Sequence, residues 1–112
     1  MSVTTSSRTQ YLGVRVLSDE REATVALDGE LDLASADMLE REVRKLRLAG
    51  FDCVVIDLGK VDFLDSTGLR VLLSLRNTAK RAGQRLILVR GPRQVQRLFE
   101  LTATGPLFDW RD

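Results

Sequence analysis

The 112-residue sequence contains no histidine and only one cysteine, and these absences exclude several kinds of active site. Without histidine, Ser-His-Asp and Cys-His catalysis are impossible, and so are the usual zinc sites that contain histidine. A single cysteine, Cys53, permits neither an internal disulfide nor a cysteine-rich metal site. No apolar run is longer than four residues, so we expect no membrane-spanning segment.

The sequence also lacks a large excess of either charge, because its 17 Lys and Arg residues nearly balance its 16 Asp and Glu residues. The resulting net charge of +1 argues against general binding to nucleic acid or to a membrane surface. The N-terminal residues lack the apolar stretch of a secretory signal, which favours a cytoplasmic location. From Ser66 to Phe99 there are eight basic residues and no acid. Because aromatic residues are almost absent from this stretch, we interpret it as solvated helix faces rather than a nucleic-acid site.

The length predicts one domain, without internal repeats or linkers. Residues 1–9 are rich in Ser and Thr and are expected to form a flexible tail, followed by a single domain over residues 10–112. Apolar periodicity predicts helices over residues 33–49, 66–82 and 93–101. It predicts strands that begin at Tyr11, Thr24, Cys53 and Leu86, with a short fifth near the C-terminus. This order predicts an α/β sandwich, in which a small mixed sheet of four to five strands packs against about three helices.

The segment most informative about function is Asp65-Ser66-Thr67-Gly68, at the predicted start of the second helix. Asp65 suits the N-cap position, because its carboxylate can accept a hydrogen bond from the backbone N–H of Thr67 or Gly68. The Ser66 hydroxyl is then left unused at the exposed first turn. Glycine costs about 1 kcal/mol relative to alanine inside a helix, so Gly68 indicates the close approach of another backbone.

Two interpretations of this segment stay open on the residues alone. Capping by itself accounts for Asp, Ser and Thr at a helix start. Alternatively, Ser66 is a hydroxyl presented for modification or contact. A nucleophilic enzyme is disfavoured, since Ser66 has no histidine and no nearby lysine in the sequence to act as a base. No glycine-rich phosphate loop is present either.

Three stretches resemble the bacterial anti-sigma factor antagonists, which are single-domain STAS proteins. Phe63–Leu69 looks like the phosphorylation-site signature of that family. Leu27–Asp32 resembles its Gly-Glu-Leu-Asp segment, and Val95–Thr102 resembles its Val-x-Arg-Leu-Phe helix. The three stretches occur in the family's order, so the resemblance implies the STAS fold.

The resemblance implies a function in partner switching. In this family the unphosphorylated antagonist binds an anti-sigma factor, usually a serine kinase of the histidine-kinase-like ATPase fold, and so frees a sigma factor. The kinase phosphorylates the motif serine, which ends binding, and a phosphatase reverses the modification. Carried over by position, the phosphoacceptor is Ser66, and the partner interface includes Asp32, Asp65, Ser66, Thr67 and Gly68. We expect no enzymatic activity, no cofactor and no metal ion.

Two further classes of function stay open. The STAS fold also serves as a scaffold subunit in lipid-transport or transporter-linked assemblies, although the intact Ser66 favours the regulatory role. An enzyme or nucleotide-binding protein is the other class, because carboxylates are plentiful.

Overall fold

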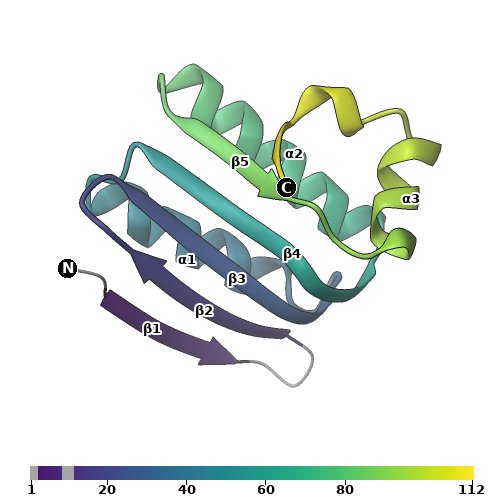
Figure 1. Ribbon diagram of the computed structural model, residues 1–112, viewed down its shortest axis with the longest axis horizontal. Coiled ribbons are helices and arrows are strands. Elements are labelled where there is room, and N and C mark those ends of the chain that lie inside the picture. The colour runs from purple at the N-terminus through teal and green to yellow at the C-terminus, as the bar shows by residue number, and fades with distance from the viewer. Residues whose placement is uncertain (1–2, 9–11) are drawn as a thin grey trace.

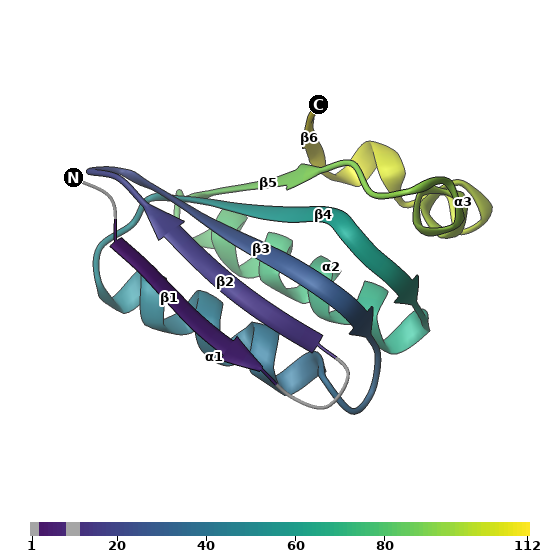
Figure 2. The same cartoon turned by 60° about the horizontal axis from the view of Figure 1, so that its bottom comes forward.

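The computed structural model describes the backbone of residues 3–8 and all of residues 12–112. In this part of the chain, one sheet of six strands carries helices α1 and α2 on the same face (Figures 1 and 2). The elements in chain order are β1 (Val3–Arg8), β2 (Leu12–Ser18), β3 (Glu22–Leu31), α1 (Ala36–Leu48), β4 (Cys53–Leu64), α2 (Ser66–Arg81), β5 (Arg85–Val89), α3 (Arg93–Leu101), the 3-10 helix η1 (Gly105–Leu107) and β6 (Asp109–Arg111).

The strands lie in the sheet in the order of the sequence, from β1 to β6. β1, β2 and β3 pair antiparallel, whereas β3 to β6 pair parallel. The helices α1 and α2 make the crossovers from β3 to β4 and from β4 to β5. Helix α3 belongs to the connection from β5 to β6 and lies beside the carboxyl end of β4 (Figure 1). The predicted α/β sandwich with a mixed sheet and three helices is therefore confirmed.

The prediction of a flexible tail over residues 1–9 is wrong for Val3–Arg8, which forms β1. Its register against β2 runs from Val3 opposite Ser18 to Arg8 opposite Gly13. The Ser and Thr content suggested disorder, but the exposed edge of β2 offers unpaired backbone groups that a further strand satisfies. With β1 included, the sheet has six strands, whereas four to five were predicted. The predicted strand start at Tyr11 lies outside the described residues.

Two element boundaries differ from the prediction in ways that shape the functional site. The first helix begins at Ala36 rather than Leu33, because a turn at Asp32 precedes it. The strand that begins at Cys53 continues to Leu64, beyond the apolar run Cys53–Ile56 from which the strand was predicted. As a result β4 leads directly into Asp65, the residue before α2.

The core lies between the sheet and helices α1 and α2, and alternate residues of the strands face it. The side chains of Val25, Leu39, Val54, Ile56 and Leu72 are among those fully buried there. A second group of aromatic rings joins α3 to the C-terminal segment. Phe99 packs edge to face on Phe108 and Trp110, with ring centroids 5.6 and 5.0 Å apart. This packing holds the C-terminal strand against the domain.

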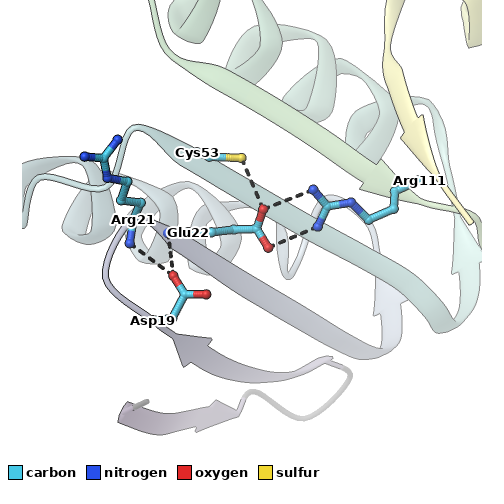
Figure 3. Close-up of polar contacts among 5 residues, drawn as sticks. All are labelled: Asp19, Arg21, Glu22, Cys53 and Arg111. Carbon is cyan, nitrogen blue, oxygen red and sulfur yellow. Dashed lines mark hydrogen bonds and ion pairs between the residues drawn. The ribbon is translucent and has the colours of Figure 1, made fainter. Parts of the chain in front are cut away.

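An ion pair crosses the sheet face opposite α1 and α2 (Figure 3). The Arg111 guanidinium on β6 donates to both carboxylate oxygens of Glu22 on β3, each at 3.0 Å. The Cys53 thiol on β4 donates to the same carboxylate at 3.7 Å. The Arg111 hydrogen bond lowers the pKa of Glu22, and burial raises the pKa of Cys53. Burial and the neighbouring Glu22 carboxylate both favour the neutral thiol of Cys53 over its thiolate.

Candidate functional site

The first turn of α2 is capped by Asp65, as the sequence predicts. Its Oδ1 atom accepts a hydrogen bond from the backbone N–H of Gly68 at 2.9 Å. The backbone of Asp65 is extended, and its carbonyl oxygen accepts from the N–H of Leu69 at 3.0 Å. Of the two donors predicted, Gly68 is the one used. The cap fixes where α2 begins and leaves Ser66 as its first residue.

Gly68 allows the start of α2 to press against the end of β3, which confirms the predicted close approach. A Cβ atom at this position would clash with the carbonyl oxygen of Leu31 and lie 2.6 Å from Leu64 Cδ1. The same Leu31 carbonyl accepts a hydrogen bond from the backbone N–H of Asp65 at 3.4 Å. Because Gly68 has no side chain, the start of α2 can pack directly against the end of β3, where the loop with Asp32 begins.

Asp32 lies in that loop and shapes it with its own carboxylate. The Asp32 Oδ1 atom accepts from the backbone N–H groups of Ala34 at 3.0 Å and Ser35 at 3.3 Å. The buried Ser35 hydroxyl in turn donates to the Glu30 carbonyl at 2.6 Å and accepts from the Asp32 N–H at 3.0 Å. Ser35 was not among the predicted site residues, although the Asp-x-x-Ser spacing is a sequence signal for such a turn.

The register of the sheet brings Asp32 beside the start of α2. Leu31 pairs with Leu64, so the next residue of each strand, Asp32 or Asp65, lies at the same end of the sheet. The predicted interface residues thus come from two neighbouring segments. Ser66 is exposed, Asp32, Asp65 and Thr67 are half-buried, and Gly68 is buried. Gly68 accordingly lies beneath the surface of the site, where it packs against Leu31, and is not itself exposed.

The Ser66 hydroxyl is presented to solvent. Across residues 12–112, no hydrogen bond or ion pair involves its Oγ atom. Because Asp65 already caps the helix, Ser66 is not needed for capping. The structure thus assigns the capping role to Asp65 and leaves the Ser66 hydroxyl without one.

Two exposed apolar side chains border the site and were not predicted. Leu33 follows Asp32 and is 77% exposed, and Phe63 precedes Leu64 and is 48% exposed. Periodicity placed Leu33 in a helix, and only the register of β3 against β4 shows that Phe63 pairs with Glu30 and faces outward. Exposed apolar side chains beside a polar site are typical of surfaces that bind another protein.

The side chains described contain no group of three or more His, Cys, Asp and Glu residues arranged to hold a metal ion. Among the helices described, none is both long and apolar enough to cross a membrane.

Comparison with known proteins identifies the family. A family model of the STAS domain matches residues 14–111 of this chain. The anti-sigma-B factor antagonist of Bacillus subtilis strain 168 is 32% identical over 98 residues, which cover 88% of this chain and 89% of that protein. The chain belongs to the STAS family of anti-sigma factor antagonists. The resemblance found in the sequence is thereby confirmed.

Solved STAS structures share the fold of this chain. The anti-sigma factor antagonist SpoIIAA in its unphosphorylated form has a TM-score of 0.71 at 15% identity, and covers 98% of this chain and 89% of its own. The Bacillus cell fate determinant SpoIIAA in its phosphorylated form has a TM-score of 0.68 at 17% identity, and covers 88% of this chain and 91% of its own. The same STAS architecture thus occurs with and without phosphate.

Proposed function

We propose that this STAS protein is an anti-sigma factor antagonist that binds its partner when unphosphorylated and is switched off by phosphorylation of Ser66. The partner is an anti-sigma factor that is also a serine kinase of the histidine-kinase-like ATPase fold, and its capture frees a sigma factor. The observation that carries the proposal is the exposed Ser66 hydroxyl, which the Asp65 cap leaves unbonded at the first position of α2. The curated name of the Bacillus subtilis relative supports it.

The phosphoryl group comes from ATP bound to the kinase. The Ser66 Oγ atom forms a bond to the γ-phosphorus, the bond from that phosphorus to the ADP oxygen breaks, and ADP leaves. The hydroxyl proton passes to a base that the kinase supplies. The chain itself acts as substrate and binding partner, and the proposal assigns it no catalytic residue.

A phosphate on Ser66 is compatible with the fold. It adds about −1.5 to −2 charge units at pH 7, and a helix N-terminus favours negative charge by about 0.3–1 kcal/mol. Ser66 lies at that N-terminus and points to solvent, so the phosphate displaces no packed side chain. The match of this chain to both forms of SpoIIAA supports a switch that leaves the fold intact.

The phosphate acts on the docking surface, which we define as Asp32, Leu33, Phe63, Asp65, Ser66 and Thr67. Leu33 and Phe63 supply exposed apolar area, while Asp32 and Asp65 supply negative charge. A partner that covers this surface would bury a phosphate beside carboxylates. Like charges juxtaposed at an interface cost several kcal/mol, which corresponds to a loss of affinity of about a hundredfold or more.

Gly68 contributes to binding indirectly, because its lack of a side chain sets the position of Ser66 against Asp32. A phosphatase that removes the phosphate restores the binding form. We place the whole cycle in the cytoplasm, where sigma factors and ATP are available.

The experiment that tests the proposal is phosphorylation by the ATPase-fold kinases of the source genome, with the modified residue mapped by mass spectrometry. One kinase should modify the wild-type protein and the Thr67→Ala variant equally, and Ser66→Ala should take up no phosphate. Equal incorporation into Ser66→Ala would contradict the assignment. Stable co-purification with a membrane transporter instead of a kinase would favour the scaffold role.

A further inference from the structure

We infer that Arg70 is the counter-ion of the phosphate on Ser66 and holds it against the surface of α2. This inference rests on the proposed phosphorylation of Ser66 and adds a residue to the switch. Arg70 is exposed on α2, four residues after Ser66. Residues four apart on a helix are neighbours on its surface.

The direction of helical side chains brings the two groups together. Side chains on an α-helix tilt toward its N-terminus, so a residue covers the turn before its own Cα atom. By this general geometry, a side chain at position 70 can reach back over the turn that begins at Ser66. An acidic group four residues before a basic one is also the favourable order for a helical ion pair.

Arg70 has no competing partner in the described part of the chain. Within residues 12–112 it makes no hydrogen bond or ion pair, whereas Arg76, further along the same helix, donates to the Leu107 carbonyl at 2.8 Å. Arg70 is also the only basic residue between Asp62 and Ser74 in the sequence. A new anion at Ser66 thus meets one available guanidinium.

The charges around Ser66 explain why this cation matters. Asp32 and Asp65 come from the two segments of the site, and their carboxylates disfavour a dianion between them. The Arg70 guanidinium offsets that repulsion and can donate two parallel hydrogen bonds to phosphate oxygens.

The inference predicts a directional effect on the ionisation of the phosphate. Pairing with Arg70 favours the dianion and so lowers the second pKa of phosphoserine, which is ordinarily about 6. An exposed pair of this spacing should lower that pKa by roughly 0.2–0.4 pH unit, as expected for a helical ion pair. The shift should shrink as salt is added, because exposed charges are screened.

The test installs phosphoserine at position 66 by genetic encoding, so that no kinase is needed, and follows its ³¹P resonance against pH. The wild-type background, Arg70→Gln, Arg70→Lys and Arg81→Gln are compared. Arg81→Gln is the matched control, because it removes the same charge from the last turn of α2. Circular dichroism verifies that every variant retains its helices.

We expect Arg70→Gln to raise the phosphate pKa, Arg70→Lys to raise it less, and Arg81→Gln to leave it unchanged. Identical titrations of wild type and Arg70→Gln would overturn the inference. Because the phosphoserine is encoded genetically, the titration result does not depend on any kinase. Failure of any kinase to modify Ser66 would overturn the proposed function and leave the titration result standing.

Discussion

Gly68 and Leu31 are in backbone contact, with no room for a side chain between the start of α2 and the end of β3. This contact joins the two segments that carry the proposed docking surface. Leu31 precedes Asp32, and Gly68 follows Ser66 and Thr67 in the first turn of the helix. The position of Ser66, the proposed phosphoacceptor, therefore depends on a residue that is itself buried.

Gly68→Ala should destabilise the protein although alanine is the better helix former. Alanine gains about 1 kcal/mol of helix propensity, but overpacking typically costs about 1–3 kcal/mol, and here the obstacle includes backbone. Thermal unfolding should show a lower midpoint than wild type. Gly105→Ala is the control, since a Cβ atom there would meet only Phe99 Cβ at 3.9 Å. A Gly68→Ala protein as stable as wild type would show that the contact is easily relieved.

Asp65→Ala should lower stability by about 0.5–2 kcal/mol, the usual effect of losing an N-cap. Asp65→Asn should largely preserve it, because asparagine accepts the same hydrogen bond from the Gly68 N–H. The measurement is chemical denaturation of both variants beside wild type. If both unfold at the wild-type midpoint, the cap contributes nothing to stability.

Glu22→Gln tests the ion pair that ties β3 to β6. The pKa of Glu22 is lowered from its ordinary value of 4.5, chiefly by the hydrogen bond from Arg111. A carboxyl whose pKa is lower in the folded state stabilises the protein above its unfolded pKa and loses that contribution as pH falls through its folded pKa.

Wild type should therefore be slightly more stable than Glu22→Gln at neutral pH, by an amount typical of exposed pairs. The difference should vanish at pH values below the folded pKa of Glu22. Thermal melts of both proteins across the acid range measure it. A difference that persists unchanged at low pH would assign the effect to packing rather than to charge.

Ser66→Asp should reproduce part of the switch. The helix N-terminus accepts the carboxylate, so thermal stability should stay equal or rise slightly at low salt. Affinity for the anti-sigma factor should fall, because the interface buries an added negative charge beside the Asp65 carboxylate. Added salt should restore little of the loss, since screening reaches buried charges poorly. Unfolding of the variant would argue against a local mechanism.

Much of the fold could be predicted because the apolar periodicity agrees with the positions of the residues that begin and end helices. The helix at Arg93–Leu101 begins and ends as predicted, and Asp65 caps α2 through a donor that its spacing indicated. β1 was missed because its side-chain composition suggests disorder, while its pairing depends on the edge of β2, which is a tertiary feature.

The apolar border of the site could not be predicted for a similar reason. Whether Phe63 faces the core or the solvent is decided by the register of β4 against β3, which shifts irregularly between Gly29 and Glu30. Leu33 lies outside α1 because the Asp32 turn delays the helix. Sequence patterns located the motif serine, but long-range pairing determines which side chains surround it.

The most direct test of the central claim is the affinity of the anti-sigma factor for this protein with and without phosphate on Ser66. Titration calorimetry with unmodified protein, stoichiometric phosphoserine at position 66, and Ser66→Ala supplies the comparison. We expect Ser66→Ala to bind like the unmodified protein, and the phosphorylated form to bind about a hundredfold more weakly or worse, at an unchanged fold. Equal affinities for the two forms would contradict phosphorylation of Ser66 as the switch.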